Sequence, residues 1–85
     1  MAATYLVTGG AGFIGSNLVH YLLETEPDAK VVVYDRLTYA GNLDNLIPVA
    51  ENPRYRFIRG DICDREQVRQ VLGEVRPTVV FNLAA

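Results

Sequence analysis

The chain has 85 residues, of which 49% are apolar, enough for one small domain with a buried core and unlike a disordered chain. The net charge is −2 and acidic and basic residues are interspersed, so neither nucleic acid nor an anionic membrane is an expected partner. The single cysteine excludes an internal disulfide and leaves a metal site unsupported, and the lack of a recognisable signal peptide or membrane span predicts a cytoplasmic protein.

The first third of the chain predicts a strand, a turn and a helix. Residues 4–8 are a short apolar run that is typical of a buried strand. Residues 13–24 have helical spacing, and the apolar side chains expected on the buried face are Ile14, Leu18, Val19, Leu22 and Leu23. Residues 25–28, Thr-Glu-Pro-Asp, are expected to stop this helix.

The turn between this strand and this helix is rich in glycine, and it contains two overlapping spacings. Gly9, Gly12 and Gly15 fit the pattern G-x-x-G-x-x-G. Gly10 begins a second pattern, G-x-G-x-x-G, which also ends at Gly15. Gly9 and Gly10 allow a sharp turn, Gly12 lets a pyrophosphate approach the backbone, and Gly15 lets the helix lie close to the strand. The positive end of the helix dipole would then face the phosphates.

An acidic residue follows the next apolar run at the distance that a dinucleotide site requires. Residues 30–35 predict a second strand, whose consecutive valines are typical of a parallel strand covered on both faces. Asp35 ends it 20 residues after Gly15, where its carboxylate would accept hydrogen bonds from both ribose hydroxyls. Because a carboxylate repels a 2′-phosphate, the pattern favours NAD over NADP. The alternative is a tight strand-to-helix turn without a ligand.

The connection at residues 36–53 predicts one short helix. Asn42 is the expected N-cap and Pro48 the expected end. The apolar face is predicted at Leu43, Leu46 and Ile47.

The last third predicts a strand, a helix and a strand. Residues 55–60 are the third strand, and the arginines at 54, 56 and 59 are expected on a solvated strand edge. Cys63 is expected to be buried or half-buried, and Asp64 to Gln67 predicts a capping box. The helix that follows has its apolar face at Val68, Val71, Leu72 and Val75, and residues 78–83 are the fourth strand.

The predicted fold class is therefore α/β, with the element order βαβαβαβ. Right-handed crossovers place the strands in the order 3-2-1-4, the N-terminal half of a doubly wound parallel sheet of the Rossmann type. The fourth strand would have an unpaired apolar edge. We therefore expect residues 1–85 to be the N-terminal portion of a dinucleotide-binding domain within a longer protein, with the rest of that domain and a substrate domain outside them.

Oxidoreductases with such a site commonly use a Tyr-x-x-x-Lys pair, in which the lysine lowers the pKa of the tyrosine. None of the five tyrosines has a lysine four residues after it. No catalytic residue is therefore predicted, and the 85 residues alone are expected to be inactive.

Several segments together resemble the extended short-chain dehydrogenase/reductase family over essentially the whole chain. Residues 8–15, Thr-Gly-Gly-Ala-Gly-Phe-Ile-Gly, match its opening fingerprint, and residues 82–85, Asn-Leu-Ala-Ala, look like the start of its fourth-strand motif. Residues 34–43, Tyr-Asp-Arg-Leu-Thr-Tyr-Ala-Gly-Asn-Leu, are similar to a loop of the dTDP-glucose 4,6-dehydratases within that family. Residues 60–64 are similar to the segment that follows their third strand.

This resemblance implies a set of NAD-binding positions. Beside Gly9, Gly12 and Gly15, the backbone N–H groups of Phe13 and Ile14 would bind the pyrophosphate. Asp35 would hold the adenosine ribose, surrounded by Arg36, Leu37 and Thr38. Asp61 and Ile62 would flank the adenine, although a turn acid that bonds its own backbone is the alternative for Asp61. Leu83, Ala84 and Ala85 would run beneath the nicotinamide side.

The resemblance also implies a reaction on a nucleotide sugar. In such lyases the C4 position of dTDP-glucose gives a hydride to NAD⁺, water leaves across C5 and C6, and the hydride returns to C6. The product, dTDP-4-keto-6-deoxyglucose, enters deoxysugar biosynthesis. The full-length protein would be a homodimer with its catalytic residues beyond Ala85. The alternatives are another NAD-dependent sugar-nucleotide epimerase or dehydratase, and a non-catalytic dinucleotide-binding module.

Overall fold

A computed structural model describes residues 3–36 and 43–83 of the chain. The predicted elements are all present, with bounds that differ from the expected ones by a residue or so at an end. In chain order they are β1 (Thr4–Thr8), α1 (Phe13–Thr25), β2 (Lys30–Asp35), the 3₁₀ helix η1 (Leu43–Val49), β3 (Tyr55–Arg59), α2 (Arg65–Val75) and β4 (Val79–Asn82). Among the described residues, no helix is long and apolar enough to cross a membrane.

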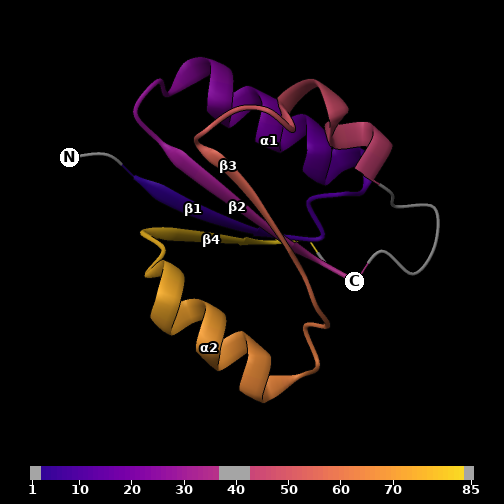
Figure 1. Cartoon of the computed structure of the whole chain (residues 1–85), viewed down its shortest axis with the longest axis vertical. Coiled ribbons are helices and arrows are strands. Elements are labelled where there is room, and N and C mark those ends of the chain that lie inside the picture. Colours follow the sequence, from indigo (N-terminus) through magenta and orange to yellow (C-terminus); the bar gives the residue numbers. More distant parts are fainter. Residues whose placement is uncertain (1–2, 37–42, 84–85) are drawn as a thin grey trace.

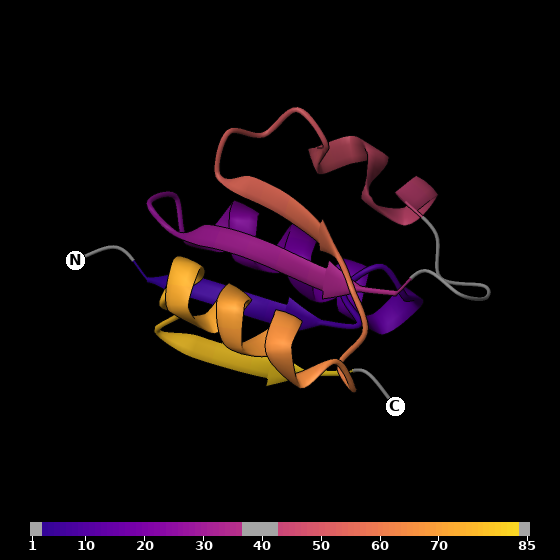
Figure 2. The ribbon, with the colours of Figure 1, turned by 60° about the horizontal axis from the view of Figure 1, so that its bottom comes forward.

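The strands form one parallel sheet in the order β3-β2-β1-β4, which confirms the predicted topology. Helices α1 and η1 cover one face of this sheet and α2 covers the other (Figure 1). Figure 2 shows the four strands side by side, with β4 and β3 at the two edges. Thr8 is in register with both Tyr34 and Asn82, so the carboxyl ends of the three strands β1, β2 and β4 meet at one end of the sheet.

Strand β2 is buried on both faces because its side chains alternate between two apolar cores. Val31 and Val33 pack in the core beneath α1 and η1. Val32 and Tyr34 point the other way and pack in a smaller core that includes Val71 of α2. Two-sided burial explains why the apolar run in β2 is continuous and does not alternate with polar residues.

Strand β4 differs from β2 because one of its edges has no strand beside it in the described part of the chain. It pairs with β1 alone there, and Val80 is 49% exposed. The unpaired apolar edge that the sequence predicts is therefore present in these residues.

Three apolar side chains that were predicted on the apolar faces of helices are exposed. One of them is Leu72 of α2, which is 40% exposed. Ile14 is 72% exposed in the first turn of α1, where the preceding turn contains three glycines and only the small side chain of Ala11. Ile47 is also exposed, and Val49 packs in the core beside Leu46 in its place. The reason is the 3₁₀ geometry of η1, in which residues three apart share one face.

The predicted end of the short helix is also wrong by one residue. Pro48 lies inside η1, which continues to Val49. Asn42 and the side chain of Leu43 lie outside the described residues, so their predicted roles stay predictions.

Arg54 closes the carboxyl end of α1, which corrects its predicted place on a solvated strand edge. Its guanidinium donates hydrogen bonds to the carbonyl oxygens of Leu23 at 2.9 Å, Glu26 at 2.9 Å and Ala29 at 3.0 Å. The last carbonyls of a helix have no N–H partner within the helix and carry the negative end of its dipole. One arginine therefore joins the start of β3 to the end of α1.

We predict that Arg54→Met lowers the free energy of unfolding by about 1–3 kcal/mol, because three carbonyl groups lose a charged donor at once. Arg56→Met is the matched control, since Arg56 is exposed and its ion pair is with exposed Glu74, at 2.7 Å. An exposed ion pair of that kind contributes at most about 1 kcal/mol. Urea denaturation followed by circular dichroism measures both, and equal losses in the two variants would contradict the capping role.

Candidate functional site

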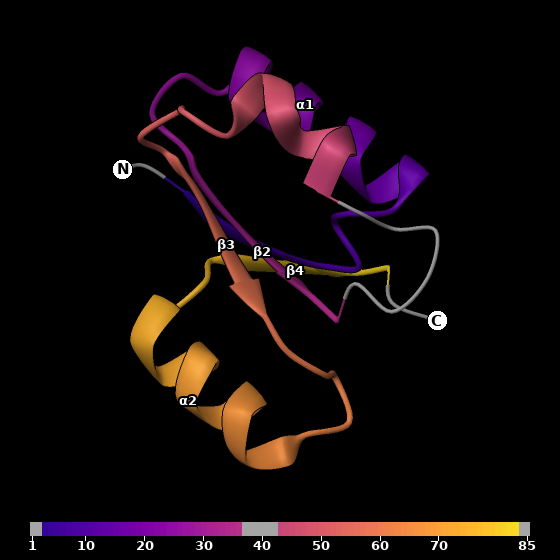
Figure 3. The same ribbon diagram turned by 45° about the vertical axis from the view of Figure 1, so that its right-hand side comes forward.

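The candidate site lies at the carboxyl end of the sheet, where three connections come together. Figure 3 shows this end toward the right, with the start of α1 above the ends of β1 and β2. The glycine turn follows β1, Asp35 and Arg36 end β2, and the segment from Gly60 to Asp64 follows β3. Open parallel sheets bind ligands at this end, near the place where the strand order reverses.

The glycine turn redirects the chain within a few residues. Gly9 has φ 75°, in the left-handed region that favours glycine, and its N–H donates to the carbonyl of Tyr34 at 3.0 Å. The N–H of Gly12 then donates to the carbonyl of Gly9 at 3.2 Å. The first hydrogen bond of α1 runs from the N–H of Ser16 to the carbonyl of Gly12 at 2.8 Å. The N–H groups of Phe13 and Ile14 precede that bond, as expected for the open start of a helix.

Close packing explains two of the glycines in this turn. A Cβ at Gly15 would overlap the carbonyl oxygen of Gly9 and lie 2.7 Å from the Cα of Gly10. Gly15 therefore lets the helix approach the glycine turn closely, one residue beyond the end of the strand for which the approach was predicted. A Cβ at Gly10 would lie 2.8 Å from a methyl group of Val33, so this glycine lets the turn sit against β2.

Gly12 is different because the protein itself leaves room beside it. Among residues 3–36 and 43–83, a Cβ there would meet only the carbonyl oxygen of Gly9, at an ordinary contact distance of 3.5 Å. Gly12 is also the N-cap of α1 and offers no capping side chain to the helix. The helix start is therefore accessible to an anionic group from outside.

Asp35 is tied to the glycine turn by a hydrogen bond. The N–H of Ala11 donates to the Oδ2 atom of Asp35 at 3.0 Å. The side chain is half-buried and lies on the α1 side of β2, as Val33 does two residues earlier. The structure therefore brings together the turn and the acid that the sequence spacing links.

Asp61 is the centre of a second group of hydrogen bonds after β3. Its carbonyl oxygen accepts from the hydroxyl of Tyr34 at 2.9 Å, and its Oδ1 atom accepts from the N–H of Cys63 at 2.8 Å. Its Oδ2 atom pairs with the guanidinium of Arg36 at 3.1 Å. The backbone bond to Cys63 and the bond from Arg36 together hold the pKa of the Asp61 carboxyl below its usual value.

Tyr34 and Gly60 lie next to one another and help to hold the hydrogen bonds around Asp61 in place. Burial first, and then the nearby charges of Asp64 and Asp61, raise the pKa of the Tyr34 hydroxyl, so it stays a hydrogen-bond donor at neutral pH. A Cβ at Gly60 would lie 2.5 Å from that hydroxyl oxygen and 2.6 Å from the side-chain oxygen of Gln67. The third strand thus leaves the sheet at a residue that has no room for a side chain.

One of the two hydrogen bonds of the capping box predicted at the start of α2 is present. Asp64 is the N-cap, and its Oδ1 atom accepts from the N–H of Gln67 at 3.1 Å. The Gln67 side chain donates to the carbonyl of Arg59 at 3.0 Å, so it ties the helix to the end of β3. Asp64 is therefore a helix cap, as predicted.

Cys63 is exposed, which corrects the prediction that it is buried or half-buried. The segment between β3 and α2 turns over the surface at this point and gives its side chain no cover. The neighbouring Ile62 is partly exposed and lines a small apolar hollow with Tyr34 and Val68.

The end of β4 lies beside the residue that precedes the glycine turn. The hydroxyl of Thr8 donates to the side-chain oxygen of Asn82 at 2.6 Å, and the N–H of Leu83 donates to the carbonyl of Thr8 at 2.9 Å. Leu83 therefore reaches the same end of the sheet as Gly9 and Asp35. The remaining predicted site residues, Leu37, Thr38, Ala84 and Ala85, lie outside the described residues.

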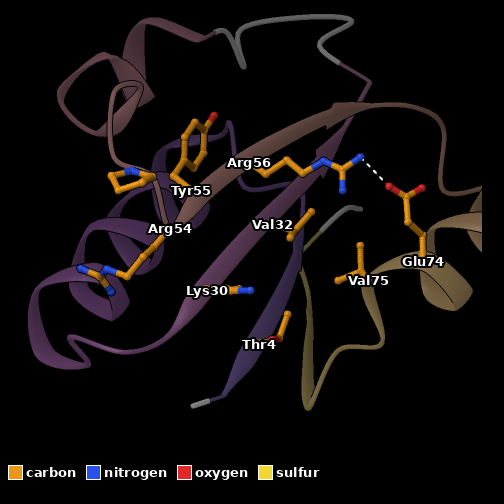
Figure 4. A pocket seen from close by; sticks show the side chains of 9 residues that line it. Thr4, Lys30, Val32, Arg54, Tyr55, Arg56, Glu74 and Val75 are labelled. Carbon is orange, nitrogen blue, oxygen red and sulfur yellow. Dashed lines mark hydrogen bonds and ion pairs between the residues drawn. The ribbon is translucent and has the colours of Figure 1, made fainter.

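A groove of about 320 Å³ lies at the opposite, amino end of the sheet (Figure 4). Thr4, Lys30 and Tyr55 line it where their strands begin. Arg54 and Arg56, which also line it, already bond the α1 carbonyls and Glu74. The groove is therefore separate from the candidate site. In the described part of the chain, no group of three or more His, Cys, Asp or Glu side chains could hold a metal ion.

Comparison with known proteins gives similarity along almost the whole chain. The family model described as GDP-mannose 4,6 dehydratase matches residues 6–85. The dTDP-glucose 4,6-dehydratase of Neisseria meningitidis serogroup B is 55% identical over 80 residues, which are 94% of this chain and 22% of that protein. The chain thus spans about a fifth to a quarter of the length of the curated relatives that it matches.

Solved structures of relatives have the same fold. A dTDP-glucose 4,6-dehydratase of Bacillus anthracis, crystallised in complex with NAD, superimposes with a TM-score of 0.94 at 44% identity, over 98% of this chain and 27% of that one. A UDP-glucose 4-epimerase of Thermotoga maritima, crystallised with UDP-glucose, gives a TM-score of 0.81 at 40% identity, over 96% of this chain and 24% of that one.

We predict opposite effects of alanine at two helical glycines. Gly15→Ala should lower the free energy of unfolding by about 1–3 kcal/mol, because its Cβ has no room against the turn. Gly73→Ala in α2 is the matched control, since a Cβ there meets nothing within 4 Å, and it should raise the stability by about 0.5–1 kcal/mol. Thermal and urea unfolding of both variants test this, and a neutral Gly15→Ala would refute the close packing.

Proposed function

The chain belongs to the GDP-mannose 4,6-dehydratase family, and from that premise we propose that it binds NAD as the cofactor-binding part of a dTDP-glucose 4,6-dehydratase. The observation that carries the proposal is the hydrogen bond from the Ala11 N–H to Asp35. It holds a ribose-binding acid beside the open start of a helix, so one dinucleotide could contact both.

The pyrophosphate would lie against the glycine turn. The N–H groups of Phe13 and Ile14, which precede the first helical hydrogen bond, would donate to it, and the α1 dipole would favour its charge. Gly9 makes the turn, Gly15 lets the helix approach it, and the room beside Gly12 lets the phosphates come close to the backbone. These contacts use backbone atoms, so they would bind the phosphates whatever the rest of the ligand is.

The adenosine half would lie across the ends of β2 and β3. Asp35 would accept hydrogen bonds from the ribose hydroxyls, and Arg36, Leu37 and Thr38 would surround that ribose. Asp61 and Ile62 would flank the adenine, with Asp61 receiving its exocyclic amine. The support for these positions is their place in the fold, since Asp61 is fixed to Arg36 and Tyr34 at the end of β2.

The nicotinamide half would extend toward the end of β4. Leu83 would run beneath it, followed by Ala84 and Ala85. The bond between Leu83 and Thr8 supports this placement because it brings β4 to the same end of the sheet as the glycine turn. Bound NAD would supply a reversible hydride acceptor at this place.

The choice of dTDP-glucose as substrate is supported by the relatives and by one stretch of sequence. Several proteins that are 44% to 55% identical to this chain are dTDP-glucose 4,6-dehydratases. Residues 37–43 resemble the loop of that enzyme more selectively than the glycine turn does. The alternative is a sugar-nucleotide 4-epimerase, because the Thermotoga enzyme has the same fold at 40% identity.

Catalysis would require residues outside these 85, since the chain spans only about a quarter of its relatives' length and contains no Tyr-x-x-x-Lys pair. We propose that the remainder of the dinucleotide-binding domain and the substrate domain belong to the same full-length protein. The homodimer and the cytoplasmic location stay predictions from the resemblance and from the sequence.

The first prediction concerns the choice of cofactor. NAD⁺ should bind at least tenfold more tightly than NADP⁺, a difference of about 1.4 kcal/mol, because Asp35 repels a 2′-phosphate. Asp35→Asn keeps an oxygen for the Ala11 N–H and loses the charge, so it should reduce this preference, and Asp35→Ala should do the same. Titration of each cofactor by calorimetry measures the ratio. Equal wild-type affinities would refute the role given to Asp35.

The second prediction concerns the reaction. Incubation of the full-length protein with dTDP-glucose, without added reductant, should give a nucleotide sugar that is lighter by one water. Mass spectrometry detects that loss directly. An isomer of unchanged mass would support the epimerase instead, and no change at all would leave an NAD-binding module without this activity.

A further inference from the structure

Asp35 and Arg36 are consecutive in the sequence but engage opposite sides of the sheet. Asp35 accepts from Ala11 on the side that α1 covers. Arg36 reaches Asp61 together with Tyr34, whose side chain packs in the core beneath α2. This division follows from the geometry of a strand end, where successive side chains point to opposite faces.

The position of Arg36 matters because an arginine beside the ribose acid is the group that accommodates a 2′-phosphate in NADP-dependent proteins of this architecture. The sequence places an arginine there, directly after Asp35. In the structure its guanidinium is 3.1 Å from the Oδ2 atom of Asp61, a partner 25 residues further along the chain.

We propose that Asp61 is a specificity-determining residue that acts through Arg36: it holds the guanidinium on the α2 side of β2, away from the ribose carboxylate of Asp35. The preference for NAD then has two sources. Asp35 repels a 2′-phosphate, and Asp61 keeps the adjacent arginine from neutralising that phosphate. This inference rests on the proposed NAD site and adds a positioning residue to it.

The Arg36–Asp61 ion pair persists at neutral pH, but it is exposed and therefore weak. The Cys63 N–H and Arg36 both favour the ionised carboxylate, so Asp61 stays charged well below neutral pH. The two side chains are 50% and 38% exposed, and solvent weakens ion pairs that are this exposed. The effect on cofactor preference should therefore be about two- to fivefold, smaller than the effect of Asp35.

The test uses a substitution that removes the pair and keeps the turn. Asp61→Asn retains one side-chain oxygen, which the Cys63 N–H already uses at 2.8 Å. The amide nitrogen would then face Arg36, donor against donor, so the guanidinium loses the acceptor that Asp61 provides. Asp61→Ser also keeps an oxygen near the Cys63 N–H and serves as a second variant in case the first one folds poorly.

The readout is the ratio of NADP⁺ to NAD⁺ affinity, measured by calorimetric titration of the full-length protein. A contact between Asp61 and adenine is common to both cofactors and would cancel in this ratio. We expect the ratio to rise about two- to fivefold in Asp61→Asn and Asp61→Ser. In the double variant Asp61→Asn with Arg36→Gln the rise should disappear, because no guanidinium remains to meet the phosphate.

Each other outcome overturns the inference in a recognisable way. An unchanged ratio in the single variants would mean that Asp61 does not restrain Arg36. An equal rise in the double variant would mean that the charge of Asp61 repels the 2′-phosphate directly. If the wild-type protein binds neither cofactor, the proposed function itself fails and the inference fails with it, whereas binding with an unchanged ratio refutes the inference alone.

Discussion

The candidate site depends on one hydrogen bond, from the backbone of Ala11 to the carboxylate of Asp35. It joins the glycine turn after β1 to the end of β2, two elements whose order in space is already fixed by the parallel pairing of these strands. Because Gly9 also donates to the carbonyl of Tyr34, the turn is held to β2 by two bonds on either side of Gly10. The Cβ-free Gly10 lets the turn rest on Val33 between them. The helix start and the acid therefore keep a fixed separation, which a site for one ligand with a phosphate and a ribose requires.

Most of this arrangement of glycine turn, helix start and acid could be predicted from the sequence, because it depends on residues that are close together along the chain. Glycine spacing, the continuous valines of β2 and the acid that ends this strand each have a direct physical meaning in a parallel αβ sheet. The predicted strand order is correct for the same reason, since crossovers between parallel strands are right-handed. One error in the predicted core concerns periodicity. The buried face of η1 was predicted with α-helical spacing, and the 3₁₀ geometry moved the inward position from Ile47 to Val49.

The long polar side chains could not be placed from the sequence, because their partners are far along the chain. Arg54 bonds carbonyls about 25 to 31 residues earlier, and Arg36 pairs with an acid 25 residues later. The alternation of Arg54, Arg56 and Arg59 along the chain predicted a solvated strand edge. A flexible side chain of this length can nevertheless bond any of several acceptors once the sheet has formed. Gln67 shows the same effect at shorter range, because the end of β3 competes for the side chain that a capping box would use. The sequence shows which polar side chains are present, and the tertiary fold determines which of them form hydrogen bonds with one another.

The distribution of these contacts indicates which residues could determine the choice of cofactor. The turn that we propose to bind the phosphates consists of three glycines and Ala11. Relatives that are described as a dehydratase and as an epimerase share the fold of this chain, with TM-scores of 0.94 and 0.81. A site built from backbone can be common to several reactions, since it recognises the part of the cofactor that does not react. Differences among such proteins must then arise from side chains around this common turn. Within the described residues, the Arg36–Asp61 pair could provide such a difference, because either side chain can change without altering the glycine turn that is proposed to hold the pyrophosphate. Under the proposed function, cofactor preference and cofactor affinity would therefore be separable properties of this site.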